Sequence, residues 1–258
     1  MIEPPRIDVL GSRISAVDAG EALRLIGLRL SEGGGGYVCF SNVHTVVTGR
    51  RDARMRAITN GSFLSVADGM PVYWVARAQG RLGRVPGPDF MKLALDRYRN
   101  RRHFLYGSTP AVLDRLAVKL REAFPGIQIC GMLSPPFRTL TSEDTQQHYA
   151  AIRAARAELV WVGLGAPKQE QWMADAAAAL RPAILLGVGA AFDFHSEFVS
   201  RAPGFMRAVG LEWLYRLVRQ PRRLWRRYLV TNTLFIFYLV RDRLCGRRDG
   251  TGTDPGSR

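Results

Sequence analysis

The sequence is poor in the residues that build disulfide frameworks and zinc sites. Its 258 residues include only three cysteines and four histidines, and all of them are scattered along the chain. There is no cysteine cluster and no H-E-x-x-H pattern, so a disulfide scaffold and a zinc site of these kinds are excluded. Sparse, dispersed cysteines are typical of a reducing compartment, which predicts a cytoplasmic protein.

Long apolar segments are lacking as well. The N-terminus has no basic stretch followed by an apolar core, so we expect no signal peptide. The longest apolar run, Tyr228–Val240, has 13 residues and includes Thr231, Asn232 and Thr233. A helix that spans a membrane needs roughly 20 apolar residues. We therefore expect this run to lie in an interface and not to cross a bilayer.

Acidic residues are the scarcer charged class. The chain has 37 Lys and Arg against 22 Asp and Glu, which gives a formal net charge of +15. Residues 201–248 hold 12 arginines, no lysine and two carboxylates, so most of the excess charge lies near the C-terminus. Such a charge implies an anionic partner, which is a nucleic acid, an anionic membrane or a phosphorylated substrate.

Short apolar runs alternate with amphipathic segments through residues 1–200. Predicted strands are Ile7–Val9, Tyr37–Phe40, Phe63–Ala67, His103–Tyr106, Ile127–Cys130, Leu159–Val162 and Ala183–Leu186. Predicted helices are Ala22–Leu30, Val43–Thr59, Pro88–Arg99, Pro110–Phe124, Ser142–Arg156 and Lys168–Leu180. This alternation predicts an α/β fold with a doubly wound, largely parallel sheet. In such sheets ligands bind beyond the carboxyl ends of the strands.

The pattern changes at residue 201. Phe205–Val218 and Pro221–Leu244 predict two helices with no strand between them. We expect residues 1–200 to form the catalytic domain, 201–246 a basic amphipathic helical appendage, and 247–258 a disordered tail.

Arginines alternate with tryptophan and tyrosine in the appendage. This alternation suits a nucleic acid and a membrane surface equally well. The apolar run Tyr228–Val240 favours the membrane, because apolar residues do not help to bind a nucleic acid. Packing of this stripe against the main domain is the alternative.

A carboxylate follows the predicted strand Phe63–Ala67. Asp68, followed by Gly69, stands where a helix is expected to begin. A carboxylate there either caps the helix or acts as a general base that removes a proton from a hydroxyl group.

Two glycine-rich loops follow the last two predicted strands. Gly163 and Gly165 precede Lys168 and Gln169, and Gly189 precedes Asp193 by four residues. Glycines allow the backbone to approach a ligand, and the next helix directs free N–H groups at an anion. The loops therefore predict phosphate or nucleotide binding, with tight turns that bind nothing as the alternative.

Further polar residues lie at the remaining candidate positions. Ser41 and Asn42 follow Tyr37–Phe40, and Asn42 either bonds a sugar or caps the next helix. Arg84 offers a cation in a loop. No D-x-D motif is present, so we expect neither a metal nor a cofactor. Arginines, backbone N–H groups and helix dipoles would then meet the charge of a diphosphate.

Seven segments, taken in order, resemble the WecG/TagA/CpsF family of glycosyltransferases over Ile7–Arg243. They are Ala67–Gly69, Arg84–Asp89, Phe104–Gly107, Val162–Glu170, Gly187–Phe194, Arg201–Pro203 and Gly210–Leu217. The resemblance implies a Rossmann-like enzyme that uses a UDP-sugar without a metal, inverts the anomeric centre and glycosylates a polyprenyl-diphosphate-linked saccharide. It also implies a cytoplasmic enzyme, peripheral at the inner face of the membrane, in cell-surface or exopolysaccharide biosynthesis.

The resemblance also implies roles for individual residues. Asp68 would be the base, Asn42 and Gln169 would contact sugar or nucleotide, and Arg84 would lie near the substrate. In the appendage, the diphosphate would be bound by Arg216, Arg223 and Arg226. Relatives use this appendage for membrane association, which can compete with self-association. Whether the protein forms a homo-oligomer therefore stays open. The transferred sugar also stays open, because Phe40-Ser41-Asn42 replaces the Thr-Pro-Asn-like strand end of the family.

Two other functions stay open at this point. A nicotinamide-dependent oxidoreductase would use the same kind of sheet, but the early G-x-G-x-x-G is lacking. A basic nucleic-acid-binding protein would show strongly salt-dependent binding and no turnover of nucleotide sugars. We expect a UDP-sugar, a lipid-linked acceptor and an anionic membrane as partners, and no nucleic acid.

Overall fold

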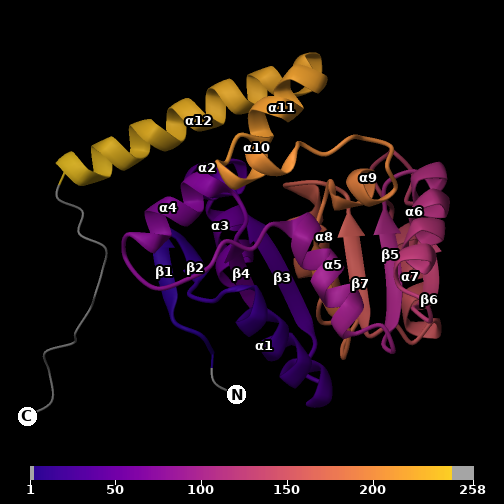
Figure 1. The fold of residues 1–258 in the computed structure, drawn as a ribbon. Helices are drawn as coiled ribbons and strands as arrows, with labels where there is room; N and C mark the ends of the chain where they lie inside the picture. Colours follow the sequence, from indigo (N-terminus) through magenta and orange to yellow (C-terminus); the bar gives the residue numbers. More distant parts are fainter. Residues whose placement is uncertain (1–2, 246–258) are drawn as a thin grey trace, which may run out of the picture.

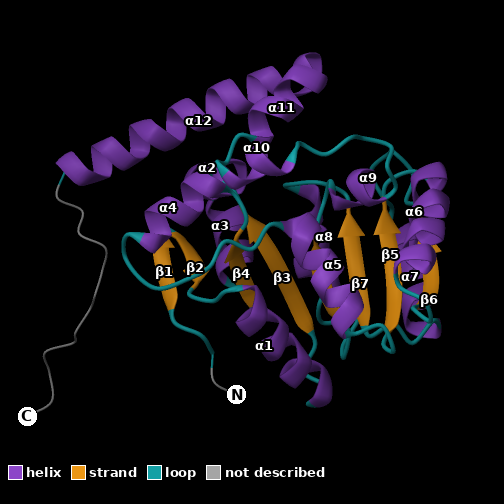
Figure 2. Cartoon of the chain, viewed as in Figure 1, coloured by secondary structure: helices purple, strands orange, loops and turns teal. Residues whose placement is uncertain are grey.

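The computed structural model describes residues 3–245, apart from the side chains of Ala208 and Arg223. Its centre is a six-stranded parallel sheet with the order β4-β3-β8-β7-β5-β6 (Figures 1 and 2). The strands are β3 (Gly36–Ser41), β4 (Leu64–Ala67), β5 (Arg102–Gly107), β6 (Gln128–Leu133), β7 (Leu159–Gly163) and β8 (Ile184–Gly187). The predicted Rossmann-like α/β fold is confirmed.

Helices cover both faces of the sheet (Figure 2). They are α1 (Ala19–Ser31), α2 (Val43–Arg51), α3 (Ala53–Asn60), α4 (Met70–Arg77), α5 (Gly87–Arg97), α6 (Pro110–Ala123), α7 (Ser142–Ala154), α8 (Lys168–Ala176) and α9 (Ala191–His195). Alternate residues of β3 pack in opposite directions. Val38 and Phe40 pack in the cluster that includes α1, α5, α6 and α9, and Tyr37 and Cys39 in the one that includes α7 and α8. Burial on both faces explains why the strands are continuous apolar runs.

The N-terminal strand does not join this sheet. β1 (Arg6–Val9) pairs with β2 (Ser12–Ser15) in an antiparallel hairpin. Leu10 and Gly11 both have positive φ, at 56° and 88°. A two-residue hairpin turn needs positive φ at both positions to match the right-handed twist of its strands. β2 was not predicted, because Ser12-Arg13-Ile14-Ser15 contains a single apolar residue.

Two predicted helices are each divided in the structure. Val43–Thr59 forms α2 and α3, because Asp52 caps a new helix by accepting hydrogen bonds from the backbone of Arg54 and Met55. Phe205–Val218 forms α10 (Gly204–Ala208) and α11 (Glu212–Arg219). Gly210 separates them with a φ of 79°, and a Cβ there would approach Met70 to 2.5 Å.

The C-terminal helix α12 (Pro221–Leu244) lies across α2 (Figure 1). Leu224, Thr231 and Phe235 recur at helical spacing and are buried. Phe235 packs among residues of α2, α4 and the hairpin, and its burial contributes about 2 kcal/mol. An Arg50–Asp242 ion pair of 2.9 Å fastens the far end. The predicted tail, 247–258, lies outside the described residues.

Candidate active site

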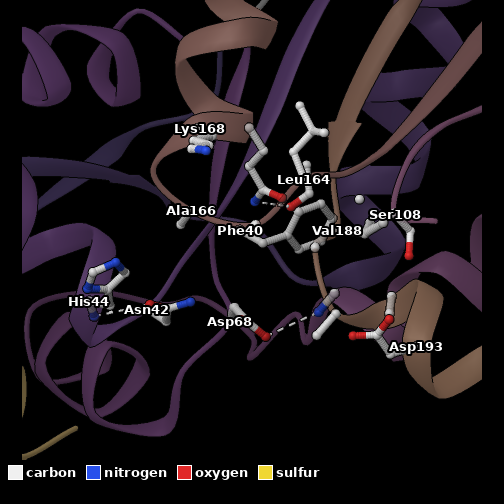
Figure 3. Close-up of a pocket in the computed structure, with 18 of the residues that line it drawn as sticks. Phe40, Asn42, His44, Asp68, Ser108, Leu164, Ala166, Lys168, Val188 and Asp193 are labelled. Atoms are coloured by element: carbon white, nitrogen blue, oxygen red, sulfur yellow. Dashed lines mark hydrogen bonds between the residues drawn. The ribbon is translucent and has the colours of Figure 1, made fainter. Parts of the chain in front are cut away.

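The strand order brings four chemically suited strand ends together. β4, β3, β8 and β7 are neighbours, so Asp68, Asn42, Gly189 and Gly165 follow the carboxyl ends of adjacent strands. These residues line a pocket of about 970 Å³ at this edge of the sheet (Figure 3). The pocket lies where a parallel α/β sheet binds its ligands.

Most of the predicted site residues meet in this pocket. Those that line it are Asn42, Asp68, Arg84, Gly163, Gly165, Lys168, Gln169, Gly189, Asp193 and Arg216. Ser41 and Arg226 are not among the lining residues. Ser41 is buried, and its hydroxyl group hydrogen-bonds that of Ser65 over 2.8 Å. Arg226 is exposed, and Arg227 lines the pocket in its place. The side chain of Arg223 lies outside the described part.

Asp68 lines the pocket and is held there by Arg84 and by Gly87, the first residue of α5. The backbone N–H of Gly87 donates to Asp68 Oδ1 over 3.1 Å, and Arg84 Nε donates to the Asp68 carbonyl over 3.0 Å. Burial raises the pKa of Asp68, although the Gly87 N–H and the Arg84 cation both act to lower it. A carboxylate with a raised pKa beside an open cavity is suited to accept a proton.

Asn42 has a structural task and also faces the pocket. Its Oδ1 accepts from the backbone N–H groups of His44 and Thr45 and so caps α2. The amide nitrogen is directed toward Asp68, whose ionised form it stabilises. Figure 3 shows Asn42 between His44 and Asp68, with Asp193 beyond Asp68. Asn42 therefore caps α2, which is one of its two predicted roles, and it also lines the pocket, as a residue that bonds a sugar would.

Gly163, the last residue of β7, and Gly165 beyond it differ in their roles. A Cβ on Gly163 would approach Phe192 to 2.6 Å, so this position is small for the sake of packing. Gly165 has a φ of 79° and no heavy atom within 4 Å of a Cβ position, so its backbone is open to the pocket. α8 begins just beyond, with no side-chain cap on its N-terminus. This N-terminus and Lys168 are suited to hold an anion.

Gln169 is oriented by two buried acceptors. Its Nε2 donates to Gly187 O over 2.8 Å and to Glu170 Oε1 over 2.9 Å, which uses both amide hydrogens. Its Oε1 has no hydrogen-bond partner within the described chain. Gln169 therefore lines the pocket with a buried acceptor left over, which suits a hydroxyl or N–H group of a ligand. Burial raises the pKa of Glu170 beside it.

Ion pairs hold the appendage over the pocket. Arg201 binds Asp89 through both terminal guanidinium nitrogens, with Nη2–Oδ2 at 2.8 Å, and its Nε lies 3.3 Å from Glu212 Oε1. Arg207 reaches Asp89 over 3.5 Å, and Arg84 donates to the Arg207 carbonyl over 2.9 Å. Burial acts to raise the pKa of Asp89, but Arg201 lowers it overall. We call this group the Asp89–Arg201 clasp.

The appendage contributes one wall of the pocket. Trp213 and Arg216 come from α11, and Arg227 and Tyr228 come from α12. His44 lines the pocket as well, and burial, aided by the charge of Arg227, lowers its pKa to about 4. His44 is therefore neutral at pH 7 and does not add to the positive charge of this wall.

Sequence reasoning missed the loop that follows β6. Residues 135–140 line the pocket, and Phe137 is 90% exposed there. The loop has no glycine and no strong charge pattern that would have marked it. The phenylalanine directly after Pro135-Pro136 was a usable signal for an aromatic residue in a loop. An aromatic ring at the rim is suited to stack on a planar ligand group.

Residues 3–245 contain neither a cluster of metal ligands nor a membrane-spanning helix. No group of three or more His, Cys, Asp or Glu side chains in that range is placed to hold a metal ion. In the same range no helix has the length and apolar character needed to cross a bilayer.

The comparison with known protein families agrees with this geometry. The model of the glycosyl transferase WecG/TagA/CpsF family matches residues 7–249, which is nearly the whole chain. The matched segment includes the four strand ends, the Asp89–Arg201 clasp and the appendage. The chain therefore belongs to the WecG/TagA/CpsF family and is a glycosyltransferase.

Proposed function

We propose that this glycosyltransferase moves a sugar from a UDP-sugar to a polyprenyl-diphosphate-linked saccharide, with inversion and without a metal. The observation that carries the proposal is the placement of Asp68. Its carboxylate, with a raised pKa, lies in the same pocket as an open glycine loop, a helix N-terminus and arginines of the appendage. A base and an anion-binding wall are what an inverting transfer with a diphosphate leaving group needs.

In the proposed reaction Asp68 removes the proton from an acceptor hydroxyl group. That oxygen attacks the anomeric carbon from the face opposite UDP, and the bond from this carbon to the diphosphate oxygen breaks. Asn42 and the N–H of Gly87 hold the carboxylate in place. Gln169 accepts a hydrogen bond from the donor through its unpaired Oε1.

The negative charge that develops on UDP is met from two sides. Gly165, the N-terminus of α8 and Lys168 lie on the sheet side, and Arg216 and Arg227 lie on the appendage side. Arg223 and Arg226 remain candidates by family resemblance alone. Asp193 and Arg84 complete the proposed substrate contacts. Loss of one such electrostatic contact costs about 100-fold in rate.

The appendage also supports a location on the inner face of the cytoplasmic membrane. Trp225, Leu229, Ile236 and Val240 form an exposed apolar stripe along α12, between 51% and 62% exposed. Arginines flank this stripe at both ends, as in helices that lie on anionic lipid surfaces. We propose peripheral attachment through this stripe, in a pathway that builds a cell-surface polysaccharide.

The direct test is UDP release from a panel of UDP-sugars, with and without a polyprenyl-diphosphate-linked saccharide, in EDTA. The panel includes N-acetylmannosamine, glucose and N-acetylmannosaminuronic acid as transferred sugars. We expect acceptor-dependent release with one donor, undiminished by EDTA. Release that requires a divalent metal would contradict the metal-independent mechanism.

Asp68→Asn tests the base. Asparagine keeps the shape and the acceptor for the Gly87 N–H but cannot take a proton, so we expect kcat to fall by about 100- to 10,000-fold. Circular dichroism and the thermal midpoint should stay close to those of the wild type. Near-normal turnover by a folded Asp68→Asn protein would remove Asp68 from this role.

A further inference from the structure

An apolar groove lies between α11 and α12, outside the parts of the molecule that the proposed reaction uses. It has a volume of about 330 Å³ and is lined mainly by Trp213, Leu217, Trp225, Tyr228 and Leu229. The two helices pack against each other and lie together above the sheet (Figure 1). Trp213 is 37% exposed, Trp225 51% and Leu229 62%, so the groove presents a large apolar surface that the described residues 3–245 leave uncovered.

The groove is continuous with the candidate active site. Trp213, Tyr228 and Asn232 line both the groove and the large pocket. The rings of Trp213 and Tyr228 meet edge to face, with centroids 5.8 Å apart, and form the wall that the two spaces share. A ligand that extends out of the pocket past this wall enters the groove.

The positive charges and the apolar groove follow each other as the diphosphate and the hydrocarbon chain do in a prenyl diphosphate. Arg216 and Arg227 line the pocket on the same two helices that form the groove. Arginine is suited to the oxygens of a diphosphate, and an apolar aromatic groove is suited to the hydrocarbon chain that follows them. A free sugar has no apolar group that would fill the groove.

The far side of the groove leads to the surface that we place on the membrane. Trp225 and Leu229 line the groove and also belong to the exposed apolar stripe of α12. A long chain held at one end in the groove would therefore continue into the apolar layer of a bilayer without crossing water. This arrangement favours a lipid chain over a soluble ligand or a peptide.

We propose that this groove binds the isoprene units next to the diphosphate of the acceptor, an inference that rests on the proposed function. The groove would then select acceptors by their chain, while the pocket selects them by their saccharide. It would also fix the direction from which the acceptor hydroxyl group reaches Asp68.

The test is calorimetric binding of farnesyl diphosphate and inorganic diphosphate, both below the micelle concentration. We expect the wild type to bind farnesyl diphosphate at least about tenfold more tightly, since burial of a few methylene groups is worth that much. Leu217→Ser removes one wall of the groove, and Thr233→Phe fills it from an exposed position. Both variants should lose this preference and keep the affinity for inorganic diphosphate.

Val230→Phe is the matched control, because Val230 lies on the same helix and is 47% exposed but does not line the groove. It should bind both ligands as the wild type does. The proposal is overturned if the wild type shows no preference for the prenyl chain, or if both groove variants keep it. It is also overturned if Leu217→Ser dissociates a dimer in sedimentation velocity while the preference persists, because a second copy would then occupy the groove.

The binding test is independent of turnover, so it separates the two proposals. If UDP release depends on the acceptor but the groove variants keep the prenyl preference, the proposed function stands and the proposed role of the groove is wrong. If no donor supports transfer but the groove variants abolish the prenyl preference, the proposed function is wrong and the groove is still a prenyl-binding site.

Discussion

At the scale of single residues, Asp68 shows how surroundings can make a common side chain suited to act as a base. A carboxylate after a strand is often only a helix cap, but α4 begins at Met70 with no side-chain cap on its N-terminus. Asp68 instead accepts from Gly87, which is distant in sequence. Burial raises its pKa, and the Arg84 cation limits the rise.

The opposed effects on Asp68 predict a pH dependence. In the proposed reaction the ionised form is the active one, so kcat/KM should fall as the pH drops through a midpoint above the ordinary pKa of an aspartate. Arg84→Gln removes a cation that favours the ionised form, so the midpoint should move to higher pH. Arg81→Gln, at an exposed position of the same loop, should leave it unchanged. A midpoint that moves to lower pH in Arg84→Gln would contradict this account.

Two adjacent arginines offer a second test at this scale. Arg227 lines the pocket, whereas Arg226 is exposed and does not. We expect Arg227→Ala to lower kcat by about 100-fold, and Arg226→Ala by far less, because only the first removes a cation facing the leaving group. Steady-state kinetics with the best donor would show the difference. A larger loss in Arg226→Ala than in Arg227→Ala would instead support Arg226 as the diphosphate-binding residue, as the family resemblance implies.

At the scale of elements, the Asp89–Arg201 clasp decides whether the pocket has its second wall. α10 and α11 bury little of their own surface, and no residue of α11 is fully buried. Their position depends on polar contacts to α5 and its preceding loop. Charged contacts of this kind, bidentate and partly buried, are stronger than surface ion pairs.

Arg201→Met should therefore loosen the appendage without unfolding the sheet. We expect faster hydrogen exchange in residues 204–219, unchanged exchange in β3 and β7, and a loss of kcat/KM of about tenfold, which corresponds to about 1.4 kcal/mol. Arg24→Met removes an exposed ion pair with Glu21 on α1 and should change neither property. Equal exchange in Arg201→Met and wild type would show that the clasp does not hold the appendage.

At the scale of the whole molecule, charge and apolar surface coincide. The appendage region carries most of the net positive charge and also the exposed stripe of α12. Anionic lipids attract each basic residue near their surface by about 1 kcal/mol, and salt weakens that attraction. A face that combines both features would hold the pocket close to a lipid-linked acceptor.

Co-sedimentation with vesicles tests this orientation. We expect binding to phosphatidylglycerol vesicles that weakens with salt, and little binding to phosphatidylcholine. Replacing both Ile236 and Val240 with glutamate should weaken binding by more than about tenfold, through lost burial and added repulsion. Val118→Glu, at a similarly exposed valine on α6, is the control and should bind as the wild type does. Equal binding by both variants would place the membrane surface elsewhere.

Much of the fold follows from local sequence signals. Apolar runs bounded by glycine, proline or aspartate marked the six strands of the sheet, because burial on both faces leaves a continuous apolar pattern. The Gly-Leu-Gly loop and the Asp68-Gly69 pair were recognisable for the same reason, since backbone freedom and carboxylate chemistry belong to the residues themselves. The hairpin was not recognisable, because β2 contains a single apolar residue, and the cap at Asp52 lies within a run of helix-forming residues. The break at Gly210 depends on its close approach to Met70, which is distant in sequence.

Only the tertiary structure decided how the site is assembled. Strand order brings Asp68 next to Asn42 and opposite the glycine loops, and no local pattern specifies that order. The packing of α12 on α2 turns Arg227 toward the pocket in place of Arg226, and Gly187 and Glu170 fix which end of the Gln169 amide faces a ligand. The sequence alone determined which chemical groups are present at the strand ends, and long-range packing determined which of them meet.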